Sequence, residues 1–484
     1  MEEEASKELP DECWEIIFNR LKHESDQESI TLVCKRFLSI SDFLRVSLKL
    51  SGYTPITVLC RLLKRFSNLK KLQVCNFRGD MNEAILAIAR SGLDLEELVA
   101  LSDCRSHPEV WLEELSSSMK SLKVLKFTGG EGDADFVRVA DAFPQLEELY
   151  IKDEAPYIIS VTDKGMDYMS SKLKRLRKID LSNKSRTAKA TPLTGISRLL
   201  HHSSQSLKSL ELGRVEFLTN EHVEYLSSFL QNLTSIKLFN CSKLSDSAFV
   251  VITQRCPHLC YFVMTGSSFV RDEYNYDGLI KNRAIKYLDI SSHQECRPKA
   301  LKRLLNICPE VEKLKLHGCY LLPDDQLNVP DILKCNRTLV ELDFTGSHHI
   351  SVKDMDLESS ELEKLIVKFS LINDIFLTKL GRICPRLIHL DLSYCSEVTE
   401  DGVKEVVKSC KRLRYLSLSR CEKVGINIIP WIVANGPSLR ELVSSSRNYP
   451  NDENQKLFLQ QGCLVLKDPN YPLNNEDEFM CNML

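Results

Sequence analysis

The residues best able to do chemistry in this chain are its 18 cysteines, because thiols bind zinc, form disulfides and act as nucleophiles. Four of them lie three positions after the last apolar residue of a short apolar run: Cys241, Cys319, Cys395 and Cys421. Four others lie three positions before the next such run: Cys256, Cys308, Cys384 and Cys410. No C-x-x-C pair provides metal-ligand spacing. This phasing predicts small buried side chains and reduced thiols, with no metal site and no cofactor.

Other catalytic patterns are not found in the sequence. It has no G-x-S-x-G, no phosphate-cradling glycine loop, no H-E-x-x-H and no motif of a catalytic ubiquitin-ligase domain. The adjacent pairs His201-His202 and His348-His349 lie in polar sequence, where we expect solvated surface. We therefore predict that the protein is not an enzyme. A self-contained hydrolase is the alternative from a different class, and activity of the purified chain alone would favour it.

Charge and hydropathy exclude further classes. The chain has 64 basic and 67 acidic residues and a net charge of −3 at pH 7, which disfavours a general binder of nucleic acid or of anionic membranes. No apolar run approaches the roughly 18 residues of a membrane helix, and the acidic first residues do not form a signal peptide. These features predict a soluble intracellular protein, in the nucleus and/or the cytoplasm.

The phase of the cysteines is set by an internal repeat. A run of the form L-x-x-L-x-L returns sixteen times, usually after about 26 residues. The runs begin at Phe43, Leu69, Leu95, Leu122, Leu146, Leu176, Leu207, Leu233, Leu259, Ile285, Val311, Leu339, Leu362, Leu387, Leu413 and Leu439. A fixed period of this length predicts a leucine-rich-repeat solenoid.

One repeat shows the elements that must position these residues. In the segment 412–421, Leu416 and Leu418 alternate with polar residues, as in a strand with one buried face. The preceding segment 401–410 has apolar residues at helical spacing. Stacked units of this kind predict an α/β solenoid, a horseshoe with a concave parallel sheet and convex helices. We expect about 16 units over residues 43–445, a C-terminal cap over 446–470 and a disordered tail over 471–484.

The repeats with C-P-x-L before the strand and a cysteine after it resemble the cysteine-containing subclass of leucine-rich repeats. The segment Cys384–Cys395 is the cleanest copy. The resemblance covers roughly residues 43 to 445, although the early units lack the cysteine.

Residues 1–42 fit no repeat and predict short apolar helices outside the solenoid, which would expose a large apolar patch. Their pattern L-P-x-E, I-F-x-x-L and V-C-K-x-F resembles the F-box, a small domain of three short helices. The matching residues are Leu9, Pro10, Glu12, Ile17, Phe18, Leu21, Val33, Cys34, Lys35 and Phe37. The spacing from Phe18 to Val33 is most similar to plant proteins related to the auxin and jasmonate receptors.

This resemblance implies partners and a role. F-box helices dock on a Skp-type adaptor, which joins them to a cullin and a RING protein, so the chain would be the substrate-recognition subunit of an SCF-type ubiquitin ligase that marks a protein substrate for proteasomal degradation. The implied adaptor-binding residues are Leu9, Pro10, Ile17, Leu21, Val33, Cys34, Lys35 and Phe37. Phe18 and Leu32 are expected to be internal. The alternatives are a small-molecule co-receptor of the hormone-receptor kind and an interaction scaffold without a ligase role.

A protein substrate would bind the concave sheet and the loops that leave it. Phe239, Tyr261 and Tyr287 are the candidate anchor, since exposed aromatic residues supply much of the energy of interfaces. Two longer units place extra loop at residues 152–161 and 182–192. The second loop carries Lys184, Arg186 and Lys189, which could contact an acidic peptide or could equally be a solvated loop.

Overall fold

Short parallel strands, each followed by a connection and usually a helix, make up most of the chain. The computed structural model describes residues 9–21, 29–51, 54–77, 79–102, 106–129, 132–153, 162–182, 193–215, 218–267, 276, 278–292, 297–319, 327–347, 350–352, 359–444 and 449–467. It divides into two units, Met1–Ser209 and Leu210–Leu484, which we describe separately.

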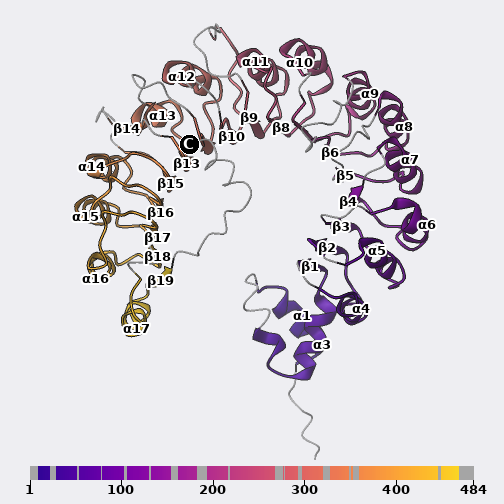
Figure 1. Cartoon of the computed structure of the whole chain (residues 1–484), viewed down its shortest axis with the longest axis horizontal. Coiled ribbons are helices and arrows are strands. Elements are labelled where there is room, and N and C mark those ends of the chain that lie inside the picture. Colours follow the sequence, from indigo (N-terminus) through magenta and orange to yellow (C-terminus); the bar gives the residue numbers. More distant parts are fainter. Residues whose placement is uncertain are drawn as a thin grey trace, which may run out of the picture. The chain divides into compact units, whose positions relative to one another are not determined.

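The first unit begins with helices α1 (Asp11–Phe18) and α3 (Lys35–Leu44) and continues as alternating strands and helices. Its strands are β1 (Ser47–Ser51), β2 (Lys71–Cys75), β3 (Glu97–Leu101), β4 (Val124–Gly129), β5 (Glu148–Asp153) and β6 (Lys178–Asp180). Its later helices are α4 (Ile56–Arg65), α5 (Met81–Ala89), α6 (Pro108–Ser118), α7 (Asp133–Ala142), α8 (Asp163–Lys172) and α9 (Leu193–Ser203). Each strand from β1 to β6 pairs in parallel with the next, and the helices α4–α9 follow one side of this sheet (Figure 1).

The second unit repeats this plan with shorter strands. Its main strands are β7 (Ser209–Gly213, which starts at the boundary), β8 (Ser235–Phe239), β9 (Tyr261–Thr265), β10 (Tyr287–Asp289), β11 (Lys313–Lys315), β13 (Glu341–Asp343), β15 (Lys364–Ile366), β16 (His389–Asp391), β17 (Tyr415–Ser417), β18 (Glu441–Ser444) and β19 (Leu464–Lys467). From β8 to β19 each of these pairs in parallel with its neighbour, and β12 (Leu327–Asn328) pairs with β14 (Ile350–Ser351).

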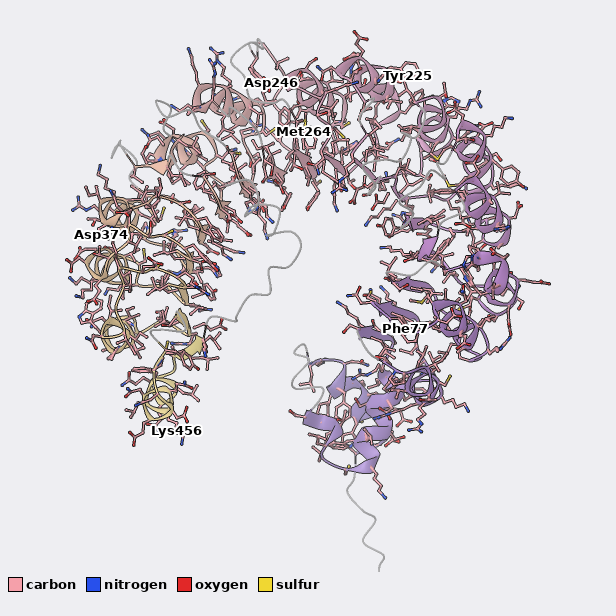
Figure 2. The ribbon with its side chains drawn as sticks, in the orientation of Figure 1. Phe77, Tyr225, Asp246, Met264, Asp374 and Lys456 are labelled. Atoms are coloured by element: carbon pink, nitrogen blue, oxygen red, sulfur yellow. The ribbon has the colours of Figure 1, made fainter. Side chains whose placement is uncertain are left out.

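Helices and one short 3-10 turn cover the other side of the second unit. They are α10 (Asn220–Leu226), η1 (Ser227–Phe229), α11 (Asp246–Arg255), α12 (Pro298–Ile307), α13 (Val329–Cys335), α14 (Asp374–Ile383), α15 (Glu400–Ser409), α16 (Ile428–Asn435) and α17 (Asp452–Gln460). Neighbouring repeats are tied at the helix starts as well. For example, Oδ1 and Oδ2 of Asp374 accept hydrogen bonds from the backbone and the hydroxyl of Thr399, at 2.9 and 2.6 Å, on the helical side of the unit (Figure 2).

The repeated apolar residues form the core between sheet and helices. Leu390, Leu416 and Leu442 occupy one ladder of the register and are fully buried. The first run is the exception, because Phe43 lies in α3 and is exposed, as is Val46. The expected F-box boundary at residue 42 therefore falls inside α3, which continues to Leu44.

All eight cysteines at the two repeat phases are buried free thiols. The Sγ of Cys395 donates to the carbonyl of Val367 at 3.1 Å, and that of Cys421 donates to the carbonyl of Leu392 at 3.0 Å. Each of these bonds joins one repeat to the one before it. Burial raises the pKa of Cys256 to about 12, which keeps that thiol protonated and unreactive.

The turn after many of the strands has a residue with positive φ. In the described part these include Asn76, Arg214, Asn240, Gly266, Ser292, Gly318, Gly346, Phe369, Tyr394 and Arg420. The backbone N–H of each of the first nine donates to a carbonyl of the following repeat, at 2.6 to 3.3 Å. The ladder hydrogen bond therefore holds this position in the left-handed conformation, which favours glycine and asparagine.

Among the described residues, no helix combines the length and the apolarity needed to cross a membrane. In the same part of the chain, no cluster of three or more histidine, cysteine, aspartate or glutamate side chains is arranged to hold a metal ion.

Candidate functional site

An aromatic cluster joins the two N-terminal helices. The ring of Trp14 lies 4.5 Å from that of Phe37 and 5.9 Å from that of Phe18, while Phe18 and Phe37 meet edge to face at 5.2 Å. Arg36 closes the other side, with its guanidinium 2.6 Å from Asp11. These contacts use the facing sides of α1 and α3. The C-terminal half of α3 also contacts the first repeat, where Arg65 of α4 donates to Asp42 at 2.6 Å.

The outward faces carry an apolar surface, which we call the N-terminal patch: Leu9, Ile16, Ile17, Leu32 and Val33. All five side chains are more than 40% exposed, and those of Leu32 and Val33 reach 86% and 65%. The two most exposed residues precede α3, whose first turn is capped by Sγ of Cys34, the acceptor of the Phe37 N–H at 3.4 Å. A turn fixed in this way keeps both side chains outside the helix pair.

The structure distributes the predicted adaptor-binding residues between two environments. Leu9, Pro10, Ile17, Val33, Cys34 and Lys35 are exposed, whereas Leu21 and Phe37 are half-buried. Phe18 is internal, as expected. The expectation that Leu32 is internal is wrong, because the chain turns at residues 32–33 between the helices and points that side chain outward.

A second surface lies on the sheet of the second unit, on positions that alternate with the buried ladder. Tyr261 and Tyr287 are opposite each other in the register of β9 and β10, and their rings stack at 4.1 Å with an angle of 9°. The Nζ atoms of Lys237 and Lys315 lie 6.0 and 5.8 Å from these two rings, so each ring is flanked by an ammonium group. Tyr287 has a raised pKa. The largest cause is burial, followed by the hydrogen bond with the Tyr261 hydroxyl and the negative charge of Asp289.

Phe239 does not join this pair, which corrects the prediction of three neighbouring aromatic anchors. Tyr261 is opposite Ser235 in the register, and Phe239 is opposite Thr265, at the far end of β8 and about 13 Å away along the strand. The Phe239 ring instead covers Gly213 of β7, where an added Cβ would lie only 2.0 Å from it. The other predicted contact residues, Lys184, Arg186 and Lys189, lie outside the described residues, as do 154–161.

Ion pairs run along the same surface with a constant polarity. The pairs are Lys237 with Glu211 (3.0 Å), Lys313 with Glu341 (3.3 Å), Lys364 with Glu341 (2.8 Å), Lys368 with Asp391 (3.2 Å) and His317 with Asp343 (2.6 Å). The basic side chains are 33% to 55% exposed and their acidic partners only 6% to 15%. The surface therefore presents basic groups to solvent although its formal charges nearly balance.

Asp343 stays ionised although it is almost completely buried. Burial by itself would raise the pKa of Asp343, but hydrogen bonds from His317 and Thr345 outweigh it and lower the pKa. Asp289, Asp343 and Asp391 also accept from the backbone N–H and the hydroxyl two residues later, so each carboxylate closes the turn after its strand.

Two further aromatic pairs were not singled out from the sequence. His389 and Tyr415 are opposite each other in β16 and β17, and their rings stack at 4.0 Å with an angle of 1°. Phe369 and Tyr394, both in the positive-φ turn position, stack at 4.2 Å. Both pairs could have been predicted from the repeat period, because residues about 26 positions apart occupy equivalent places in neighbouring repeats. The residues of the first pair are 26 positions apart and those of the second pair 25.

Parallel strands, buried leucine ladders and helices on one side of the sheet define an α/β leucine-rich-repeat protein, and the predicted fold class is confirmed. No family model matches the chain. A curated relative, the F-box/LRR-repeat protein 4 of Bos taurus, is 24% identical over 241 residues, which are 50% of this chain and 30% of that protein. The match supports an F-box/LRR-repeat protein. The chain thus aligns with less than a third of this relative's length.

Solved structures with a similar fold have low sequence identity. A chain of the yeast Rad7 and Elc1 complex is 14% identical with a TM-score of 0.43, over 94% of this chain and 92% of that one. A chain of the TLR13-ssRNA13 complex is 15% identical with a TM-score of 0.46, over 89% and 76%. The plant-type origin and the cysteine-containing subclass stay predictions.

Proposed function

We propose that this chain is a non-catalytic substrate-recognition subunit of an SCF-type ubiquitin ligase. The observation that carries the proposal is the N-terminal patch, which consists of five exposed apolar side chains on and between two helices outside the repeats. It occurs where the sequence has the F-box pattern, and the curated relative named above is an F-box/LRR-repeat protein.

Energetics favour a partner for this patch. Burying one large aliphatic side chain contributes about 1.5–3 kcal/mol, so covering five of them stabilises a complex by several kcal/mol. Several large apolar side chains exposed on and between two packed helices mark an interaction site. In our proposal the Skp-type adaptor covers the patch and connects the chain to a cullin and a RING protein. Leu9, Pro10, Ile17, Val33, Cys34 and Lys35 then form the outer contact, with Leu21 and Phe37 at its base.

The sheet of the second unit would hold the client. Its stacked tyrosines, Tyr261 and Tyr287, are rigid amphipathic rings of the type that dominates protein interfaces. We propose that a protein segment bound there is presented for ubiquitin transfer and degraded by the proteasome. The repeats would contribute no catalytic group, and the chemistry would belong to the partner proteins.

The proposal is tested by measuring the affinity of the purified full chain for an immobilised Skp-type adaptor. Both Val33→Glu and the double variant Leu9→Ala/Pro10→Ala should weaken binding by about tenfold or more, because a charge or a cavity is placed in the apolar contact. The matched control is Val110→Glu, at an exposed valine of α6 in the same unit, which should bind like the wild type.

Undiminished binding by Val33→Glu would reject the adaptor assignment. The client surface is tested separately in cells by proximity labelling with a chain that lacks the F-box residues. In that chain Tyr261→Ala/Tyr287→Ala should lose labelled clients, and in the full chain the same double variant should keep full adaptor affinity. An unchanged set of labelled proteins would remove the tyrosine pair from the proposal without affecting the adaptor site.

A further inference from the structure

The turn position with positive φ has two unusual occupants. Other repeats place glycine, asparagine, serine or arginine there, but β15 is followed by Phe369 (φ 53°) and β16 by Tyr394 (φ 62°). Bulky side chains are disfavoured in this conformation, because Cβ approaches the following carbonyl oxygen. Asn240 and Gly346 make the same ladder hydrogen bond without an aromatic ring, so the fold does not require one. Backbone strain of this kind is a reason to look for function.

The two rings form a platform on the edge of the sheet. They are stacked at 4.2 Å with an angle of 20°, and Tyr394 is 39% exposed. The same turn continues to two aliphatic side chains with still higher exposure, Leu371 (56%) and Ile375 (64%), the second of which lies in the first turn of α14. The stacked pair Phe369 and Tyr394 is called the edge platform below. The exposure of Leu371 and Ile375 contrasts with that of the buried neighbours Ser370 and Ile372.

Basic groups border the platform on the sheet side. Lys368 directly precedes Phe369, and Lys364 lies four residues before it in the same repeat. Both lysines are about one third exposed, while their partners Glu341 and Asp391 are almost covered. Arg420 is exposed at the next positive-φ position after Tyr394.

The acidic groups around the platform do not cancel this bias. Glu397 lies in the outer loop and is engaged by Lys423 at 2.6 Å. Glu441 is exposed opposite Tyr415 and limits the basic stretch on the side of β18.

We propose that the edge platform, with Lys364 and Lys368, binds an acidic protein segment that carries an aromatic or large aliphatic residue. The apolar residue would stack on Phe369 and Tyr394, and the carboxylates would meet the exposed part of the Lys364 and Lys368 ammonium groups, next to their existing partners Glu341 and Asp391. This deepens the proposed function by naming the class of substrate. The role of the bound segment as a ubiquitination substrate rests on the proposed ligase function. Binding of the segment to the edge platform does not, because it needs neither the adaptor nor the ligase.

The direct probe is a fluorescein-labelled dodecapeptide of glutamate and glycine with one central phenylalanine, titrated with the purified full chain and followed by anisotropy. Two matched peptides replace the glutamates with lysine or the phenylalanine with alanine. The acidic aromatic peptide should bind with a Kd below about 1 mM. Each matched peptide should bind about tenfold more weakly.

The decisive variant is Phe369→Asn/Tyr394→Asn, because asparagine occupies the same turn position at Asn76 and Asn240. It should bind the peptide about tenfold more weakly. Since it removes backbone strain, its melting temperature should not fall. Tyr225→Ala, at an exposed tyrosine of α10 on the helical side of the unit (Figure 2), is the control and should leave both quantities unchanged.

Three results would overturn the proposal. The first is no binding of the acidic aromatic peptide at about 1 mM. The second is equal binding of all three peptides. The third is unchanged binding with a lowered melting temperature in Phe369→Asn/Tyr394→Asn, which would assign the rings to packing. Adaptor affinity, measured in parallel, distinguishes these failures from a failure of the proposed function, because the N-terminal patch is untouched.

Discussion

The two units contain the same repeat but present different polar surfaces on their sheets. In the first unit the polarity of the sheet pairs varies: Lys126 is 25% exposed over a Glu148 that is 33% exposed, whereas Lys71 is 58% exposed over a Glu97 that is 19% exposed. In the second unit every such pair described above has the base outside, as in Lys313 (55%) over Glu341 (14%). Both units have the same buried leucine ladders, because the fold requires them. The two units differ at the solvent-facing strand positions, where the fold does not require a particular residue.

Backbone strain is distributed just as unevenly. Among the described residues of the first unit, Asn76 alone is a residue other than glycine with positive φ, and asparagine tolerates that conformation. The second unit has Arg214, Ser292, Phe369, Tyr394 and Arg420 in it as well. Each bulky residue there costs about 1–2 kcal/mol. Backbone strain in the described residues is therefore concentrated in the second unit.

The largest predicted effect tests whether the units are independent at all. Trp111 in α6 is fully buried edge to face with Phe127, and Phe249 in α11 is fully buried against Phe262. Trp111→Ala and Phe249→Ala should each cost about 3–5 kcal/mol of local stability through lost burial and a cavity. Because repeats contact mainly their neighbours, hydrogen exchange should rise mostly in the strands of the mutated unit.

Peptide-resolved hydrogen exchange by mass spectrometry reads the two units side by side, and each variant is the control for the other. An equal rise in both units for either variant would show one cooperative block. The two sheet surfaces would then belong to a single cooperative folding unit.

A smaller effect tests the polarity of the ion pairs. Burial alone would raise the pKa of Glu341, but its hydrogen bonds and charge interactions with Lys364 and Lys313 outweigh burial and lower the pKa. The ionised Glu341 therefore stabilises the folded state at neutral pH, and this contribution is lost as the pH falls below about 4.5. Glu341→Gln should cost about 1–2 kcal/mol at pH 7. Glu148→Gln, in the exposed pair of the first unit, should cost about 0.5 kcal/mol or less.

Urea denaturation at pH 7 measures both variants. Equal losses would mean that burial of the acid contributes nothing to the difference between the two sheets. A loss confined to Glu341→Gln that disappears at about pH 3 would support the linkage argument, since the wild-type carboxylate is then protonated as well.

The repeat period was sufficient to predict which residues form the core, but it was not sufficient to predict how the surface residues are arranged. Leu416 and the eight phased cysteines could be placed from the sequence, because a 26-residue step puts the same position of every repeat into the same layer. Leu32 could not, because it sits in a turn between two helices, where apolar character does not determine direction. Phe239 shows the second limit. Its aromatic character was visible in the sequence, but its place in the ladder depends on where the strand begins.

The edge platform shows a third limit. Phe369 and Tyr394 follow their strands at the position where neighbouring repeats have Gly346 and Arg420, so the repeat alignment contains the signal. The alignment does not give the φ angle. That angle is needed to tell an aromatic residue in a relaxed backbone conformation from one in a strained conformation. A substrate contact by the extra loops at 152–161 and 182–192 stays a prediction, whereas the platform lies among regular repeats.

The smallest predicted effect concerns the pH response of the second unit. Burial, then the charge of Lys364, lowers the pKa of His389 to about 4 from an ordinary 6.5, against the opposing charges of Asp391 and Glu341. The folded chain therefore favours the neutral ring, which stacks on Tyr415. The resulting stabilisation is complete above about pH 6.5 and declines as the pH falls toward 4, because the unfolded chain then binds more protons.

After discounting for partial exposure, wild-type stability should fall between pH 7 and pH 5 by about 1 kcal/mol more than that of His389→Phe, which keeps an aromatic ring without a titrating group. The control is His107→Phe, at an exposed histidine of the first unit, which should retain the wild-type pH dependence. Denaturation curves at the two pH values decide the matter. If His389→Phe retains the wild-type slope and His107→Phe flattens it, the pH-sensitive element lies in the first unit, and the two sheets differ in charge polarity without differing in proton linkage.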